Sequence, residues 1–434
     1  MTSYDRLGGT RAWLIWSIAT LFVIAGFSFQ TAYGVTSTEI ASDLSLTLVQ
    51  VGVLGATYTW AVAIMQLFSG AILDRVGIRI LAWVSLFSVV GGFAYANAGS
   101  FEMLILSNIC IAVGHAFAFV GAGMVGGKWF GWGRFGLMFG LVQGAGAFGS
   151  YFNQNVTRYL VQDYGWSFSL NVIAFIILII SVLMLLFMRE PRRPDVEKPE
   201  WTGTKNLIIS VFRSLKHIVT RLHLWLNTVH GGMTFGVHLS VSLVWGPIFL
   251  AETGMSVFDA VAISSFAFLG MLVGAPLWVW VSERIKRNKP MAVIPAIFHA
   301  ALLAYAILDP SVATKTTFFF IGLASASTAM NYPIAGSLVP ESLVGTSSAF
   351  VNTMQFFWTG VLMAVPGLAL SGAGVWAMLA GTTGIDAADP SLSDYQSAMM
   401  LLVYAVCIGV VAALLTKESF PSEANAEARK EVEI

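Results

Sequence analysis

The amino-acid sequence predicts an all-α polytopic membrane protein with twelve transmembrane helices in two six-helix halves, and three observations support this prediction. First, 57% of the 434 residues are hydrophobic and 11% are charged, whereas soluble domains average about 25% charged residues. Second, the apolar residues form long runs, and most charged residues lie in short segments between them. Third, Lys and Arg alternate between basic-rich and basic-poor loops, as in multi-pass proteins.

Each apolar run is long enough to cross about 30 Å of hydrocarbon, which takes about 20 helical residues. Glycine, proline or charged residues bound the runs and mark the turns between them. An even number of spans places both termini on the same side of the membrane. In chain order the runs cover residues 12–34, 49–73, 80–98, 102–127, 135–157, 166–188, 222–250, 257–281, 290–308, 313–337, 345–371 and 395–416.

The positions of Lys and Arg test the number of spans independently, because these residues concentrate in cytoplasmic loops. Of the 23 Lys and Arg, 21 lie in the termini or in even-numbered loops. Arg158 and Lys315 are the two on the opposite face. A missed or extra span would break this alternation, so we expect both termini to be cytoplasmic.

An internal repeat divides the chain near its middle, because spans that begin at 12, 80, 102 and 135 recur about 210 residues later. Between the halves, residues 205–221 place apolar side chains at helical spacing opposite Lys205, Arg213 and Lys216. This pattern predicts an amphipathic helix at the membrane surface, with an ordinary solvated linker as the alternative. The predicted divisions are a first half 1–188, a linker 189–221, a second half 222–416 and a tail 417–434.

Composition and motifs exclude several classes of function. The net charge is zero, so the chain offers no strong basic field to nucleic acid. Cys110 and Cys407 both lie in apolar runs and give neither a disulfide framework nor a metal cluster. The short aqueous segments carry no Ser-His-Asp arrangement, phosphate loop or metal-ligand spacing. We therefore expect no enzyme activity, no cofactor, no metal and no nucleic-acid partner.

The turn after the second span carries Gly70, Asp74, Arg75, Gly77 and Arg79 in one ten-residue stretch. Gly70 can let a neighbouring helix approach, Asp74 can cap a helix end or pair with a basic residue, and Gly77 can adopt a positive φ. Any tight hairpin also collects Gly and Arg, but these five residues together resemble the signature of the major facilitator superfamily. The resemblance implies two six-span halves and a cytoplasmic gate formed by Asp74, Arg75 and Arg79.

The second half keeps Glu283 and Arg284 at the equivalent turn but lacks the glycines, so its copy of the gate is degraded. Three more stretches resemble the bacterial branch that includes intraphagosomal amino-acid transporters, which implies a monomer in the bacterial inner membrane. Where that branch carries an arginine in the fourth span, this chain has Asn108. The three stretches are Gly114–Gly121, Lys128–Phe130 and Gly165–Phe168.

No full charge needs to lie near the bilayer centre, because each Asp, Glu, Lys and Arg can be placed in a loop, a tail or a span end. Charged side chains inside a membrane usually have a function, so this pattern disfavours small inorganic or dicarboxylic anions as substrates. The titratable candidates are then His115, His230 and His238, with His299 as a weaker one. A buried histidine can also be a packed hydrogen-bonding group.

Uncharged polar and aromatic residues on the spans that line the cavity in this fold can bind a neutral or zwitterionic solute. The alternative for each is helix packing, since Asn and Gln also bridge helices. Asn331 and Tyr332 rank first, because the following Pro333 interrupts a helix. Besides the three histidines, the substrate candidates are Gln30, Tyr33, Gln143, Asn331, Tyr332, Asn352, Gln355 and Trp358.

The sequence and the resemblance together predict a secondary transporter that moves a small organic solute by alternating access. The expected solute is neutral or zwitterionic, such as an amino acid or a peptide, and transport is either coupled to protons or uncoupled. The expected partners are the solute, protons and the lipid bilayer. A siderophore or drug exporter, or a non-transporting receptor on a transporter scaffold, is the alternative.

Overall fold

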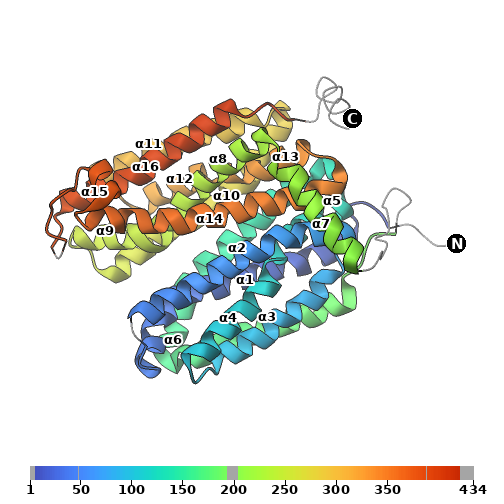
Figure 1. Ribbon diagram of the computed structural model, residues 1–434, viewed down its shortest axis with the longest axis horizontal. Helices are drawn as coiled ribbons and strands as arrows, with labels where there is room; N and C mark the ends of the chain where they lie inside the picture. Colours follow the sequence, from blue (N-terminus) through green and yellow to red (C-terminus); the bar gives the residue numbers. More distant parts are fainter. Residues whose placement is uncertain (1–4, 47, 193–203, 388, 421–434) are drawn as a thin grey trace. The chain divides into compact units, whose positions relative to one another are not determined.

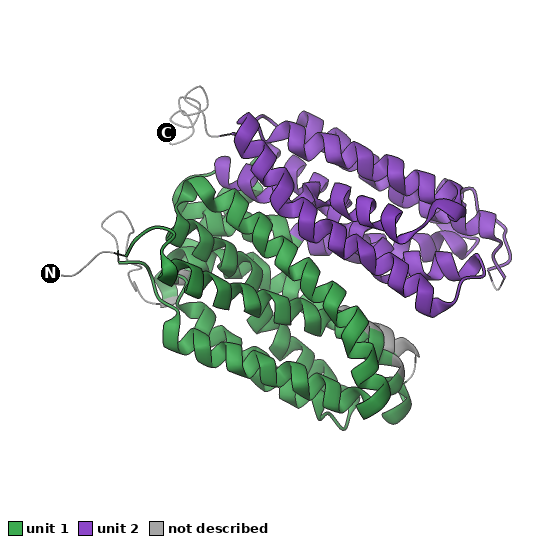
Figure 2. Ribbon diagram, turned by 180° about the vertical axis from the view of Figure 1, so that it is seen from behind, with its two compact units in different colours: residues 1–221, 339–353 green, residues 222–338, 354–434 purple. Residues whose placement is uncertain are grey.

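The computed structural model describes residues 5–46, 48–192, 204–387 and 389–420 (Figure 1). Within these residues every regular element is helical. The helices form two compact units, which Figure 2 draws in different colours. Unit 1 comprises Met1–Arg221 and Val339–Thr353, and unit 2 comprises Leu222–Leu338 and Met354–Ile434.

Unit 1 contains the first six spans and one further helix. Helices α4 and α5 form a single span with a turn at Ala116 and Phe117. A 3-10 turn at Trp132–Arg134 precedes the longest helix. The α-helices are α1 (Thr10–Asp43), α2 (Leu48–Val76), α3 (Ile80–Ala96), α4 (Phe101–His115), α5 (Ala118–Phe130), α6 (Phe135–Phe187) and α7 (Thr204–Val219).

Helix α6 consists of two spans that meet at Gly165, whose φ of 79° and ψ of 167° are not helical. The next residue, Trp166, donates its backbone N–H to Glu39 (3.2 Å) and its indole N–H to Asp43 (2.7 Å). Both carboxylates lie in the last turns of α1. The contacts therefore bind the end of α1 to the start of the sixth span.

Unit 2 contains the remaining spans, apart from residues 344–353 at the start of α14, which belong to unit 1. Two of these spans depart from regular α-helix. The span after α8 continues through a π-helical turn, and the segment 315–337 changes to a 3-10 helix at its centre. Short 3-10 turns also occur at Pro310–Val312 and Glu341–Leu343. The elements are α8 (Leu222–Ser240), the π turn (Val241–Trp245), α9 (Gly246–Glu252), α10 (Val257–Ile285), α11 (Lys289–Leu308), α12 (Lys315–Ser325), the 3-10 segment (Ala326–Met330), α13 (Asn331–Ser337), α14 (Val344–Leu370), α15 (Gly374–Ala380) and α16 (Leu392–Leu415).

Nine helical segments of the described chain are long and apolar enough to span a membrane. Segment Trp132–Phe187 counts twice because Gly165 divides it. Ile80–Ala96 is apolar but slightly shorter, and the interrupted segment 315–337 supplies one more crossing. These segments give the twelve predicted spans. The residue ranges of the predicted halves remain a prediction, and residues 339–353 cluster with unit 1.

Close helix packing in unit 2 depends on small residues between α10 and α12. A Cβ on Gly274 would lie 2.6 Å from the carbonyl oxygen of Leu323. A Cβ on Gly270 would lie 2.5 Å from the Leu323 backbone nitrogen. A larger residue at either position would push the two helices apart.

Candidate functional site: a carboxylate gate and buried polar networks

Asp74 binds the start of α14. Its Oδ1 accepts the Gly345 backbone N–H (2.9 Å), and its Oδ2 accepts the backbone N–H (2.7 Å) and the hydroxyl (2.7 Å) of Thr346. These N–H groups belong to the first turn of α14, where they have no partner within the helix. A carboxylate is favoured at this end by the helix dipole. Asp74 therefore caps a helix that lies 271 residues further along the chain.

Gly70 and Gly345 let α2 and α14 approach closely enough for this contact. A Cβ on Gly70 would overlap the carbonyl oxygen of Gly345 and lie 2.5 Å from the Cβ of Ala349. A Cβ on Gly345 would lie 2.9 Å from the Gly70 carbonyl oxygen and would overlap the Asp74 carboxylate. The close approach explains why glycine stands at both positions. Gly77, with a φ of 87°, then forms the turn into α3 as predicted.

The basic residues of the predicted gate have other surroundings. The Arg75 guanidinium donates to the Ser214 hydroxyl of α7 (3.3 Å), and Arg79 lies exposed just before α3. In the second half, the Arg284 guanidinium lies 5.1 Å from the ring centroid of Trp280. Glu283 lies beside it, at the end of α10. The carboxylate and the guanidinium groups of the motif thus contact different elements.

Two carboxylates that the sequence analysis missed cap equivalent helices in the two units. Glu190, just after α6, accepts the Ile78 backbone N–H (2.6 Å) and pairs with Lys128 (3.0 Å). Glu418, just after α16, accepts the backbone N–H groups of Asn288 (2.8 Å) and Lys289 (3.3 Å). Each acid follows a basic residue directly after the last span of a half. This basic–acidic pair, repeated after the last span of each half, could have identified both carboxylates from the sequence.

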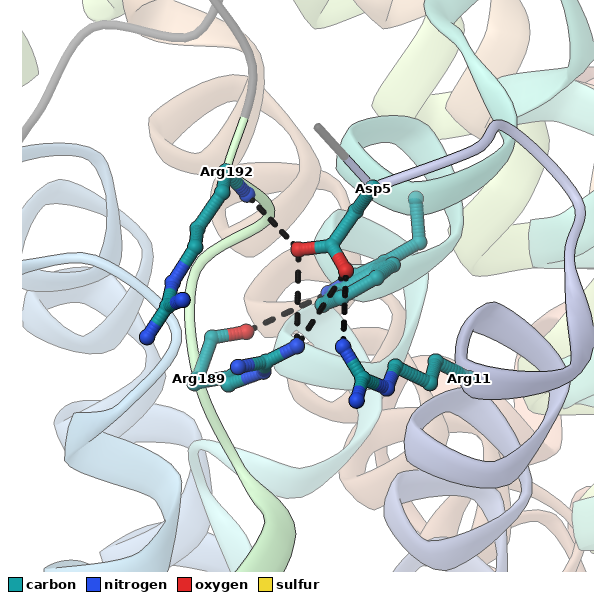
Figure 3. A network of polar contacts seen from close by, with 5 residues as sticks. Asp5, Arg11, Arg189 and Arg192 are labelled. Atoms are coloured by element: carbon teal, nitrogen blue, oxygen red, sulfur yellow. Dashed lines mark hydrogen bonds and ion pairs between the residues drawn. The ribbon is translucent and has the colours of Figure 1, made fainter. Parts of the chain in front are cut away.

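Asp5 ties the N-terminal segment to the end of α6 (Figure 3). Its carboxylate lies 3.2 Å from the Arg189 guanidinium and 3.4 Å from that of Arg11, and it accepts the Arg192 backbone N–H (2.9 Å). Burial acts to raise the pKa of Asp5, but the Arg192 N–H and the charges of Arg189 and Arg11 outweigh it. The pKa of Asp5 therefore lies below its ordinary value of 3.8.

We expect Asp5→Asn to lower the melting temperature at neutral pH, because the amide cannot pair with the two guanidinium groups. The folded-state pKa of Asp5 is depressed, so its stabilising effect is present above the unfolded pKa and is lost as the pH falls through the folded pKa. The difference between wild type and variant should therefore shrink below pH 3.8. Thermal unfolding as a function of pH measures it. A difference that is constant across this range would contradict the expected charge effect, and Glu102→Gln, at an exposed helix start, is the matched control.

In unit 1, His115 lies between α1 and α2. Its Nδ1 hydrogen-bonds to the Tyr58 hydroxyl (3.0 Å), and its ring packs on Gly26 of α1. The His115 Nε2 has no hydrogen-bond partner among the described residues. Tyr33 packs against Gly55 of α2. The predicted residues of unit 1 are Gln30, Tyr33, His115, Gln143 and Asn352, of which Gln30 and Tyr33 are half-buried and the others buried.

In unit 2, the amide of Asn331 lies at the centre of a buried network. It donates to the side-chain oxygen of Asn227 (2.8 Å) and to Nδ1 of His230 (3.1 Å), while the Asn227 amide donates to the Asn331 carbonyl (2.9 Å). His230 in turn donates from Nε2 to the carbonyl of Ala292 (3.1 Å). Asn331 directly follows the 3-10 segment, at the interruption that the sequence predicts.

A second chain of hydrogen bonds joins Tyr332, Gln355 and Thr328. The Tyr332 hydroxyl donates to the Gln355 side-chain oxygen (2.7 Å), and the Gln355 amide donates to the Thr328 hydroxyl (2.9 Å). Trp358 packs on Gly232, where a Cβ would overlap its indole. Thr328, which the sequence analysis did not single out, completes this chain. The predicted residues of unit 2 are His230, His238, Asn331, Tyr332, Gln355 and Trp358.

Comparisons with known proteins agree with this architecture. The family model described as Major Facilitator Superfamily matches residues 18–364. The chain is 24% identical to the uncharacterized transporter YybO of Bacillus subtilis over 83% of this chain and 87% of that protein. It is 22% identical to the probable galactarate/D-glucarate transporter GudP of Escherichia coli, over 67% and 72%. The solved structure of the proton:xylose symporter XylE superposes with a TM-score of 0.73 at 17% identity, covering 97% of this chain and 99% of that one.

Proposed function

Because the chain belongs to the major facilitator superfamily, we propose that it is a secondary transporter that carries a small organic solute across the membrane by alternating access. The contact between Asp74 and the first turn of α14 is the observation that carries this proposal. It is a charge-assisted cap on a helix end, formed by three hydrogen bonds. Such a contact can break and re-form without unfolding either helix, as a gate requires.

We propose that the solute is neutral or zwitterionic. In the described spans, the buried residues with polar side chains are Ser, Thr, Asn, Gln, His and Tyr. No Glu, Lys or Arg is among them, and Asp74 is half-buried with its carboxylate bonded to the first turn of α14. Amides, hydroxyls and imidazoles recognise hydroxyl, amide and amino-acid groups by hydrogen bonds. An anionic substrate would require a fixed cation to offset its desolvation. An amino acid or a small peptide fits this set of groups.

A sugar acid is the second candidate. GudP is named for galactarate and D-glucarate, which are hydroxylated dicarboxylates. The hydroxyl groups of these sugar acids can hydrogen-bond to the same amides that would bind a neutral solute. Their carboxylates require a positively charged side chain as a partner. Arg158, which is half-buried in α6, is a cation that could take this role, whereas the half-buried Lys128 is already paired with Glu190.

A thermal-shift screen of the purified protein separates these candidates, because a ligand stabilises the state it binds. The probes are amino acids, dipeptides, glucose, galactarate, D-glucarate, a siderophore and a cationic dye. At 100 times its Kd a ligand adds about 2.7 kcal/mol, which raises the melting temperature by a few degrees. Stabilisation by amino acids or peptides supports the proposal. If glucarate stabilises the wild type but not the Arg158→Gln protein, the solute is a sugar acid. If only the dye or the siderophore stabilises the protein, it is an exporter.

We propose further that the chain is a monomer in the bacterial inner membrane, with both termini cytoplasmic. The asymmetric distribution of Lys and Arg supports this orientation. With Cys110 and Cys407 replaced, a cysteine at Lys286 should resist an impermeant maleimide in intact cells, and one at Thr383 should react. The reverse pattern would contradict the orientation.

A further inference from the structure

Helix α7 of unit 1 has two apolar sides, and only one of them is buried in the protein. The buried side consists of Val211, Ser214 and Ile218, each at most 4% exposed. These positions are three and four residues apart, so they lie on one side of the helix. The other apolar side chains are between 42% and 58% exposed, and they are Ile208, Ile209, Phe212 and Val219.

Two lysines share the exposed side of α7 with these apolar residues. An α-helix turns about 100° per residue, so residues 205, 208, 209, 212, 216 and 219 fall within an arc of about 100° that excludes the buried positions. This arc, with Arg213 next to it, is called the outer face of α7 below. Lysine stems can lie along an apolar surface while their amino groups reach a polar layer. A helix with this pattern is suited to the boundary between hydrocarbon and charged groups.

The outer face carries only positive charge. Residues 204–219 include Lys205, Arg213 and Lys216 and contain no Asp or Glu. All three side chains are exposed, and none of them forms an ion pair with a described residue. A basic residue close to an anionic membrane surface strengthens binding about fivefold. The charge of α7 therefore complements a negatively charged partner.

The outer face continues onto the membrane-spanning helix α2. The ring of Phe212 packs edge-on against Phe68 of α2, with their centroids 6.2 Å apart. Ile64 lies one helical turn before Phe68 and is 56% exposed. Because α2 is long and apolar enough to span a membrane, its exposed apolar side chains contact lipid acyl chains. The outer face of α7 therefore lies beside lipid, near the end of α2.

We propose that the outer face of α7 binds the headgroups of anionic phospholipids, and that the bound lipid holds α7 against α2. Lys205, Arg213 and Lys216 bind the phosphates, and the apolar side chains of the outer face lie among the adjoining acyl chains. On the buried side, the Arg75 guanidinium donates to the Ser214 hydroxyl (3.3 Å). Lipid on α7 thus also holds the residue that follows Asp74. This proposal goes beyond the proposed transport function and does not depend on it.

A spin label on α7 tests lipid binding in the full-length protein. With Cys110 and Cys407 replaced, a cysteine at Ile209 carries a nitroxide. The protein is placed in nanodiscs of phosphatidylcholine alone, or of phosphatidylcholine with one third phosphatidylglycerol. Collisions of the nitroxide with nickel ethylenediaminediacetate, a neutral water-soluble complex, report its exposure to water. We expect phosphatidylglycerol to lower this accessibility at least threefold.

A triple variant and a matched control show whether the effect belongs to α7. Lys205→Gln, Arg213→Gln and Lys216→Gln combined should remove the difference between the two nanodiscs. The control replaces three exposed basic residues of unit 2 by Gln and should keep the difference; these residues are Lys286, Arg287 and Lys417. A control that removes the difference equally would reduce the effect to general surface charge. Equal accessibility of the wild-type label in both nanodiscs would show that the outer face is open to water. Either result would overturn the proposal.

A cysteine at Val211, on the buried side of α7, shows whether the lipid holds the helix against α2. N-ethylmaleimide, which is uncharged, should label it at least fivefold more slowly with phosphatidylglycerol than without. The triple glutamine variant should be labelled at the faster rate in both nanodiscs. Equal wild-type rates would overturn the claim that lipid holds α7 in place. Neither assay contains a solute, so failure here leaves the transport function standing, and a protein that moves no solute can still show the lipid effect.

Discussion

Asp74→Asn should reduce solute uptake at least tenfold while the protein still folds and enters the membrane. The carboxylate accepts three hydrogen bonds at the start of α14. An asparagine would keep one acceptor oxygen and turn an N–H₂ group toward a backbone N–H. Each hydrogen bond to a charged group contributes about 1.5–3 kcal/mol, so losing one or two shifts the gate equilibrium tenfold or more.

Uptake is measured with the solute that the thermal-shift screen identifies. A readout that needs no solute is maleimide labelling of a cysteine at Ala349, which is fully buried beside Gly70 in unit 1. Labelling should accelerate in the Asp74→Asn protein. Glu102→Gln, an acid-to-amide change at an exposed helix start, should leave both quantities unchanged. If a protein with both Asp74→Asn and Arg75→Ala takes up solute at the wild-type rate, the Asp74 contact is not a gate in transport.

Gly70→Val should abolish uptake, because no rearrangement of a flexible side chain can make room for the new atoms. The added Cβ meets the backbone carbonyl of Gly345, and backbone moves only if α2 and α14 separate. Separation breaks the three hydrogen bonds of Asp74 in the same step. We therefore expect labelling of a cysteine at Ala349 to be at least as fast as in Asp74→Asn.

Gly99→Val is the matched control, because a Cβ at Gly99 would have no atom within 4 Å. It should retain wild-type uptake. A Gly70→Val protein that transports normally would show that the close approach of α2 and α14 is not needed for the cycle. The amount of each variant in the membrane fraction is measured, and its folding is checked by size-exclusion chromatography of the extracted protein.

The spans were predictable because the hydrocarbon core imposes a length and a composition that local sequence reveals. The same local signals could not show that α1 continues to Asp43, since its last turns are polar and are held by Trp166 rather than by lipid. Gly77 was predictable as a turn from its position in the motif. For the neighbouring Asp74, the sequence left a helix cap and an ion pair with a basic residue as alternatives, because its partner Thr346 is distant in sequence.

The candidate site was less predictable than the fold, for a physical reason. Amides and imidazoles on apolar helices form hydrogen bonds with side chains of other helices in the bundle. A single sequence does not show which helices pack together. Asn331 and His230 were recognised as candidates, but their mutual hydrogen bond depends on the packing of α8 against α13. His299 was a weaker candidate than the other three histidines, although it is fully buried and neither ring nitrogen has a hydrogen-bond partner among the described residues.

The Asp5 contact has a consequence for biosynthesis. It joins residues 184 positions apart, and ribosomes add about 5–20 residues per second. The N-terminal segment therefore waits roughly 10–40 s for Arg189 to be added, after all six spans of unit 1 have been synthesised. Glu418 follows α16, so the cap on α11 forms only after α16 has been synthesised. The sixth and the last described spans are thus each followed by a residue that holds an earlier segment, Arg189 for Asp5 and Glu418 for the start of α11.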